Sequence, residues 1–339
     1  MRRWRPDPGW AGNWSMPPVF DGPVSERERA VLVAMSCEGF GPKRLAQQLV
    51  AAERIEDLWD EHGSSLRSRL NALASLGSRA IVPSDDEYPE NLASIDAPPV
   101  LLYAKGEPID PSVPRVAIVG ARACTAGAAR FASRLGEAFA RAGLVVVSGL
   151  ARGIDVAAHR GALVAGSTIA VTGTGIDVCY PPEHREIATR IVTSGTIVTE
   201  FPPGTGPRAW HFPARNRIIA GLSDALVVVE AGMSSGALIT AGFALDQGRH
   251  VFACTTGPEN PAGAGVRELL KDGAGLIIDA DQAVEVVTAV LADQGFAFGK
   301  PVSRGERAVD LDADLRQIYD AVTEDCSVDE VAANAGLSP

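Results

Sequence analysis

The sequence predicts an α/β fold built on a doubly wound parallel sheet. Two observations support this prediction. Short apolar runs alternate with longer segments of helical period, at the spacing of β-α-β units. Three of the apolar runs also end in a glycine-rich turn: RVAIVGAR (Arg115–Arg122), VVVSGLARGID (Val145–Asp155) and IAVTGTG (Ile169–Gly175). Strands buried on both faces give such continuous Val- and Ile-rich runs.

The elements of this sheet are expected in regular alternation along the chain. The first strand lies within Arg115–Arg122. Further strands are expected at 144–147, 168–171, 197–199, 225–229, 250–253 and 276–278. Helices are expected at 126–142, 154–165, 182–193, 213–222, 237–247 and 281–291. The proline-rich stretch from Ile81 to Pro114 predicts short extended pieces that lead into the sheet.

The flanking segments differ in composition, and the chain divides into five predicted parts. GFGPKRL (Gly39–Leu45) is typical of a helix-hairpin-helix turn and equally of a plain turn between helices. Ser327 and Glu330 form a capping box that begins a short helix. The parts are a disordered leader (1–24), a small helical domain (25–80), the sheet domain (81–292), a linker (293–309) and a partial winged-helix-like segment (310–339).

Composition narrows the class of protein. Among the 339 residues 46% are hydrophobic, as in ordinary globular proteins. The five cysteines are scattered, without a C-x-x-C pair, which argues against a zinc site and against a disulfide framework. No apolar run approaches the length that spans a membrane. We therefore expect a cytoplasmic protein with no metal site.

The charge is unevenly distributed. The net charge is −11, yet the stretch from Arg115 to Arg217 carries twelve arginines, no lysine and six acidic residues. A basic centre between acidic ends favours a local groove for phosphates. Some of these arginines, such as Arg130, Arg134 and Arg141, are expected on solvated helix surfaces instead.

The glycine-rich turns provide candidate anion-binding residues. Without a Cβ, backbone N–H groups and the following helix start can approach a phosphate closely. Parallel sheets bind ligands at the edge formed by the carboxyl ends of their strands, where these turns lie. None of the turns fits the G-x-G-x-x-G nicotinamide pattern, so no cofactor is expected. The candidates are Gly120, Arg122, Gly149, Arg152, Gly173 and Gly175, with Ser235 and Gly236 at another helix start, where ordinary N-capping is an alternative.

WHFPARNR (Trp210–Arg217) combines rings and cations. Arg215 and Arg217 flank Asn216 at a helix start, and Phe212 precedes them. Single-stranded nucleic acids are bound by this mixture, because cations neutralise phosphates and rings stack on bases. The alternative is a helix start salt-bridged to the sheet, with Phe212 in the core. If phosphates are the partners of Arg122 and Arg215, replacing either should leave stability nearly unchanged.

Six motifs together resemble the DprA (Smf) DNA-processing family over about residues 81–291. They are GAR at Gly120, SGLARGIDVAAHRGAL at Ser148, YPPEH at Tyr180, TEFPPGTGP at Thr199, FPARNRIIAGLS at Phe212 and SGALITAGFALDQGRHVFA at Ser235. The resemblance implies an extended Rossmann-like fold, with flanking SAM/helix-hairpin-helix-like and winged-helix-like domains. It also implies a non-enzymatic protein that binds single-stranded DNA and loads the RecA recombinase during natural transformation.

The same resemblance implies roles for individual residues. Arg122, Arg152, Arg215, Asn216 and Arg217 would line the strand-binding pocket, with Phe212 as a stacking ring. A homodimer would form through the helix and strand that carry Arg267, Leu270 and Leu276.

The main alternative to a DNA-binding protein is an enzyme of the LOG type, which cleaves nucleoside monophosphates. Its P-G-G-x-G-T-x-x-E signature is replaced here by VVVEAGMSSGALITA.

Overall fold

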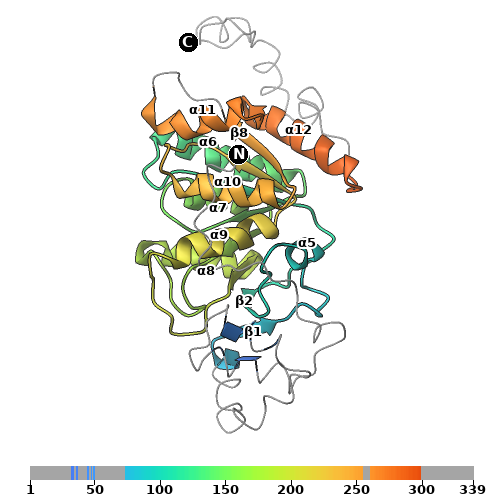
Figure 1. Cartoon of the computed structure of the whole chain (residues 1–339), viewed down its shortest axis with the longest axis vertical. Coiled ribbons are helices and arrows are strands. Elements are labelled where there is room, and N and C mark those ends of the chain that lie inside the picture. Colours follow the sequence, from blue (N-terminus) through green and yellow to red (C-terminus); the bar gives the residue numbers. More distant parts are fainter. Residues whose placement is uncertain are drawn as a thin grey trace, which may run out of the picture. The chain divides into compact units, whose positions relative to one another are not determined.

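The computed structural model describes residues 73–254 and 260–298, together with seven residues between Leu32 and Leu49. The predicted leader, most of the predicted N-terminal helical domain with the turn at Gly39, most of the linker and the predicted segment 310–339 lie outside the described residues. Most of the described residues belong to the sheet domain (Figure 1).

A nine-stranded sheet forms the centre of the described residues, in the order β1-β2-β6-β5-β4-β3-β7-β8-β9. The seven strands from β6 to β9 in this order run parallel, whereas β1 and β2 pair antiparallel at one edge. The strands are β1 (Ser78–Ile81), β2 (Leu102–Gly106), β3 (Arg115–Val119), β4 (Val145–Ser148), β5 (Thr168–Val171), β6 (Thr196–Thr199), β7 (Ala225–Val228), β8 (His250–Cys254) and β9 (Gly275–Ile277).

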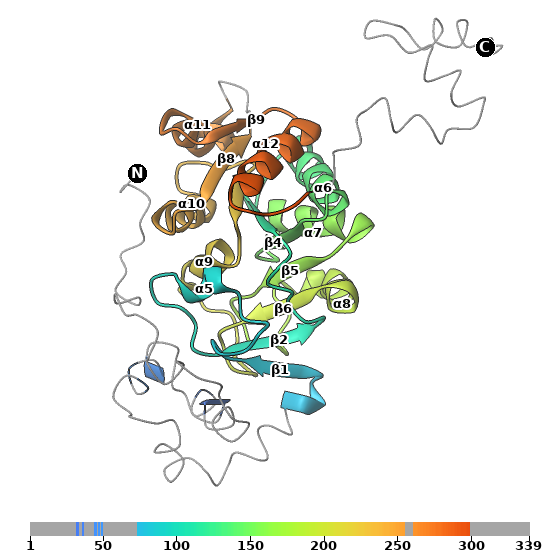
Figure 2. The ribbon, with the colours of Figure 1, turned by 90° about the vertical axis from the view of Figure 1, so that its right-hand side faces the viewer.

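Helices cover both faces of this sheet, as Figure 2 shows. One face carries α6 (Ala126–Arg141), α7 (Ile154–Ala165) and α8 (Arg185–Ser194), with α12 (Ala280–Asp293) packed beside α6. The other face carries α5 (Glu90–Ala93), α9 (His211–Gly221), α10 (Gly236–Asp246) and α11 (Ala264–Lys271). Short 3-10 turns at Pro182–His184 and Pro261–Gly263 precede α8 and α11.

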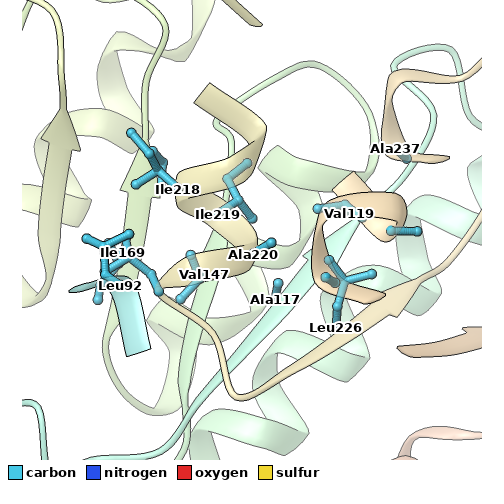
Figure 3. Close-up of a cluster of buried hydrophobic side chains, with 14 of the residues drawn as sticks. Leu92, Ala117, Val119, Val147, Ile169, Ile218, Ile219, Ala220, Leu226 and Ala237 are labelled. Atoms are coloured by element: carbon cyan, nitrogen blue, oxygen red, sulfur yellow. The ribbon is translucent and has the colours of Figure 1, made fainter. Parts of the chain in front are cut away.

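The core explains why these segments become central strands. Every residue of β3 and of β7 is buried, so apolar side chains on both sides of each strand find a covering helix. Figure 3 shows Ala117, Val119, Val147, Ile169 and Leu226 of the sheet facing Ile218, Ile219 and Ala220 of α9. The sheet is therefore fixed by packing on both faces.

The helices α6 and α7 pack unusually closely because glycines face each other's backbone. A Cβ on Gly161 would overlap the carbonyl group of Ser133, and one on Gly136 would overlap that of Ala158. Glycine at these two positions lets the two backbones touch, which larger residues would prevent.

The order in which strands are added to the sheet reverses between β3 and β7, which are parallel neighbours. From β3 the chain passes to α6 on one face, and from β7 it passes to α10 on the other. The chain segments that follow the two strands consequently separate and leave a crevice at the edge of the sheet. This is the position at which open α/β sheets bind ligands.

The predicted fold class is confirmed, and the differences are local. The predicted helix 154–165 has the bounds of α7, but α9 begins at His211 rather than at residue 213. The predicted helix 182–193 is a 3-10 turn followed by α8. Two of the expected extended pieces are β1 and β2, and the predicted domain boundary after residue 80 falls inside β1.

A buried ion pair joins α9 to the end of β6. Nη2 of Arg217 lies 2.5 Å from Oε1 of Glu200, and the two side chains are 2% and 5% exposed. Nε of Arg217 donates to the carbonyl of Ala97 at 2.9 Å, and Nη1 donates to that of Ala214 at 3.2 Å. Arg217 is thus held by protein groups deep in the fold.

We predict that Arg217→Leu destabilises the protein by about 3–5 kcal/mol, because Glu200 would remain buried without its counter-charge. Urea unfolding followed by circular dichroism measures this change. The control is Arg130→Leu on the exposed surface of α6, expected to shift stability by no more than about 0.5 kcal/mol. An Arg217→Leu variant that unfolds at the wild-type midpoint would show that the guanidinium serves a ligand instead.

Candidate nucleic-acid interface

A cleft of about 750 Å³ opens where the carboxyl ends of β3, β4 and β7 meet. It lies at the crevice between β3 and β7 described above. Its walls come from the turn after β3 (Gly120–Ala123), from Ala151, Asp155 and Tyr180, from the loop Pro207–Ala209, from Phe212, Arg215 and Asn216 of α9, and from Gly232, Ser234, Ser235 and Thr240 around the start of α10.

Arg122 and Phe212 form a pair in this cleft. The guanidinium carbon of Arg122 lies 4.9 Å from the centroid of the Phe212 ring, which is a cation–π distance. On another side the Phe212 ring packs against Tyr180, at 5.6 Å between centroids. A Cβ on Gly173 would lie 3.2 Å from Phe212, so glycine there leaves room for the ring. Because Arg122 is exposed and Phe212 half-buried, both can meet a ligand.

Glu230, directly after β7, fixes the turn that carries Arg122. One oxygen of its buried carboxylate accepts from the backbone N–H of Thr125 and the other from the Thr125 hydroxyl, each at 2.9 Å. The backbone carbonyl of Glu230 also accepts from the N–H of Ala121. A Cβ on Gly120 would lie 2.5 Å from Ile154, so the turn fits closely against α7. Arg122 is therefore presented from a rigid loop.

Arg215 lies in the floor of the cleft and is 4% exposed. Its Nη1 donates to the carbonyls of Gly149, at 2.7 Å, and of Val171. A Cβ on Gly149 would lie 2.6 Å from this guanidinium, which explains the glycine. The sequence predicts ligand phosphates as partners of Arg215, and in the structure protein carbonyls hold its side chain in place.

Asp155 lies beside Arg215 and is buried with it. Burial raises the pKa of the Asp155 carboxyl, and the charge of Arg215 partly offsets the rise. Burial also lowers the pKa of Arg215 to about 10, which leaves the guanidinium protonated at neutral pH. Its Nε has no hydrogen-bond partner among the described residues. The floor of the cleft thus contains a buried cation with a free donor.

The start of α10 forms the opposite wall. The Ser235 hydroxyl caps the helix by accepting from the N–H of Ala237 at 3.3 Å, and Gly236 is exposed. Nδ2 of Asn216 donates to the carbonyl of Gly236 at 3.2 Å and so ties α9 to this turn. The positive end of the α10 dipole therefore faces the same space as Arg122.

The structure brings together seven of the twelve predicted binding residues: Gly120, Arg122, Phe212, Arg215, Asn216, Ser235 and Gly236. Gly149 and Gly173 lie directly behind them, against Arg215 and Phe212. Gly175 packs against the loop at Pro202 instead, and Arg152 is exposed in an ion pair with Glu183. Arg217 is paired with Glu200, away from the cleft walls.

Sequence reasoning missed Arg208 and Glu230. Arg208 is an exposed cation in the cleft wall, in a loop rich in proline and glycine that gives no periodic signal. Glu230 could have been found, because an acidic residue directly after an apolar central strand must have a buried partner. Its partner, Thr125, lies 105 residues earlier in the chain.

The residues predicted for self-association lie on α11 and on β9, at one edge of the sheet. Arg267 on α11 is half-buried and donates to the carbonyl of Asn260 at 2.9 Å, and Leu270 packs against the core. Leu276 belongs to β9, the edge strand, and is 44% exposed, while Ile278 directly after it is 61% exposed. Of the three predicted residues, Leu276 is the one that presents an apolar side chain to solvent.

In the part of the chain that spans residues 73–254 and 260–298, no three His, Cys, Asp or Glu side chains converge as metal ligands would. None of its helices combines the length and the apolar composition needed to cross a bilayer.

Comparisons with known proteins agree with this geometry. Residues 79–288 match the family model described as DNA recombination-mediator protein A. The chain is 37% identical to Smf of Synechocystis, over 80% of this chain and 76% of that protein. It is 44% identical to DprA of Streptococcus pneumoniae, over 57% of this chain and 68% of that protein.

Solved structures show the same relationship. The X-ray structure of Streptococcus pneumoniae DprA matches with a TM-score of 0.63 at 33% identity, covering 80% of this chain and 94% of that one. The Helicobacter pylori protein matches with a TM-score of 0.57 at 27% identity, covering 64% and 96%, and its structure concerns the single-stranded DNA binding mode of that protein. The resemblance drawn from the six motifs is confirmed: the chain belongs to the DNA recombination-mediator protein A family, which includes proteins named DprA and Smf.

Proposed function

We propose that the protein binds single-stranded DNA in the cleft without sequence preference, and that it acts in the cytoplasm as a dimer that loads RecA during DNA uptake and recombination. The observation that carries this proposal is the Arg122–Phe212 pair, an exposed cation above a ring in one cleft. An unpaired base can stack on the ring while its phosphate contacts the guanidinium.

The other walls of the cleft favour phosphate over base-edge recognition. Arg208 and the start of α10 add positive potential, and the buried charge of Arg215 lies beneath. Such groups bind the backbone of a strand and read little sequence. The Phe212 ring lies inside the cleft, where it can reach a base that is not stacked and paired in a duplex. A preference for single strands follows from this position.

The carboxylates in the cleft and behind its wall favour binding over catalysis. Behind the wall, both oxygens of Glu230 accept hydrogen bonds from Thr125, and in the cleft Asp155 is buried beside the Arg215 charge. Both carboxylates therefore already have partners within the protein. The LOG-type alternative requires release of a base from a nucleoside monophosphate, so a hydrolysis assay with a nucleotide panel distinguishes the two functions directly.

The first experiment compares single-stranded with duplex DNA of equal length by fluorescence anisotropy. We expect tighter binding to the single strand and a steep fall in affinity with added salt, because binding releases counter-ions from phosphates. Arg122→Ala should weaken binding by about 1.5–3 kcal/mol, the contribution of one charge-assisted hydrogen bond. It should also reduce the salt slope by about one unit.

The matched control for that experiment is Arg130→Ala, which removes an exposed arginine from α6 outside the cleft walls. It should leave both affinity and salt slope unchanged. Arg122→Lys should recover part of the loss, since lysine keeps the charge without the planar fork. Equal losses in the Arg122 and Arg130 variants, or tighter binding to duplex, would rule out the cleft as the binding site.

We expect the dimer to form through the β9 edge. Leu276 and Ile278 place two exposed apolar side chains at this edge of the sheet. Leu276→Glu should give monomers in sedimentation velocity experiments. Val164→Glu, which changes another exposed apolar residue, on α7, should leave the dimer intact. A wild-type monomer at micromolar concentration would contradict this placement.

The RecA step requires that one particle hold DNA and also admit a second protein. Two clefts in one dimer would retain a long strand through avidity while segments between them stay open. We therefore predict that wild-type protein shortens the lag before RecA hydrolyses ATP on single-stranded DNA, and that Arg122→Ala abolishes this effect. No change in the lag with wild-type protein would exclude RecA loading while leaving DNA binding intact.

A further inference from the structure

Trp210 is an exposed aromatic residue that the cleft described above does not include. Five large apolar side chains of the described residues are strongly exposed: Val164, Trp210, Met233, Leu276 and Ile278. Trp210 is the aromatic member of this set and is 49% exposed. Leaving half of an indole in water forgoes a large burial energy, so the position calls for an explanation.

The indole is held in place by buried neighbours. It lies edge-to-face with the His211 ring, at 4.2 Å between centroids and 84° between planes, and it makes a similar contact with Phe201 at 6.0 Å. His211 and Phe201 stack on each other at 4.0 Å and are 2% and 4% exposed. The His211 ring is anchored in turn through Nδ1, 2.9 Å from the carbonyl of Gly173. Trp210 is therefore ordered before any ligand binds.

The position of Trp210 in the chain places it beside the cleft. It directly follows Pro207–Ala209, which line the cleft wall, and it caps α9, which presents Phe212. Its backbone carbonyl accepts from the N–H of Ala214, so it is fixed to the first turn of the helix. Two residues span at most about 7 Å of backbone, so one strand can reach both Trp210 and Phe212, although the two rings project from different sides of the helix start.

A cation accompanies this second ring as well. Arg208 is exposed, lies in the cleft wall and precedes Trp210 by two residues. The charge of Arg208 helps to lower the pKa of His211, although burial is the larger cause. The imidazole between the indole and the cleft is therefore neutral at physiological pH and does not compete with Arg208 for a phosphate.

We propose that Trp210 and Arg208 form a second stacking position, at which an unpaired nucleobase of the bound strand stacks on the indole and its phosphate pairs with the guanidinium. The Arg122–Phe212 pair is the first such position, and the strand passes from one to the other over the loop Pro207–Ala209. This proposal rests on the proposed function, because it assumes a single-stranded ligand. It adds a contact outside the cleft and predicts a longer binding site.

Tryptophan fluorescence tests this contact directly. The other four tryptophans are Trp4, Trp10, Trp14 and Trp59, and changing them to Phe leaves Trp210 as the sole indole. We expect oligo(dT) to quench its emission. An abasic oligomer of equal length, which keeps the phosphates without the bases, should bind more weakly and leave the emission nearly unchanged. Equal quenching by both oligomers, or by neither under saturating DNA, would overturn the stacking role.

Affinity measurements provide the second arm. Trp210→Ala and Trp210→Leu should each weaken binding to single-stranded DNA about tenfold, within the range for one stacked base. Trp210→Phe should stay within about twofold of wild type, because a ring is retained. Val164→Ala is the control for loss of an exposed apolar side chain and should have no effect. Thermal melting of each variant accompanies the titrations.

The outcomes separate this inference from the proposed function. Wild-type protein that fails to bind single-stranded DNA would overturn both. Binding that depends on Arg122 but is unchanged in Trp210→Ala would overturn the second stacking position alone. If Trp210→Ala both melts early and binds weakly, the fluorescence contrast between oligo(dT) and the abasic oligomer decides the matter.

Discussion

A parallel sheet has to bury both of its faces, and this requirement determines where the protein can bind a ligand. Helices on each side occupy the faces, and the strands β3 and β7 have no exposed residue. The ends of the strands, where loops follow, are therefore the places at which the sheet can bind a ligand. The chain segments that follow β3 and β7 pass to opposite faces of the sheet, and the cleft with Arg122 and Phe212 opens at that point.

Three arginines of similar appearance in the sequence have different physical roles. Arg122 is exposed above a ring, Arg215 is buried with carbonyl partners, and Arg217 is neutralised by Glu200. Helix geometry explains part of this difference. Residues two apart project about 200° from each other around a helix, so Arg215 and Arg217 cannot face the same cleft. The two arginines are close in the sequence, but the helix directs their side chains to different sides.

Local sequence patterns predict most of the sheet domain but only part of the site. Val- and Ile-rich runs predict the central strands within one or two residues, because burial on both faces leaves a local signature. The antiparallel pairing of β1 and β2 has no such signature, since it depends on contacts across the fold. Turn glycines and Arg122 could be predicted from local chemistry. A buried partner for Glu230 could be expected, but its identity could not be predicted, because Thr125 is distant in sequence.

The geometry of the cleft also depends on residues outside it, through the close contact between α6 and α7. Each helix begins directly after one of the turns at the cleft, α6 after the turn with Arg122 and α7 after the turn with Arg152. Gly136 and Gly161 let the two helices touch along their length. The separation of the helices therefore sets the separation of the two turns. A single added methyl group at Gly161 would act as a wedge and shift the alignment of the two turns, although it touches neither of them.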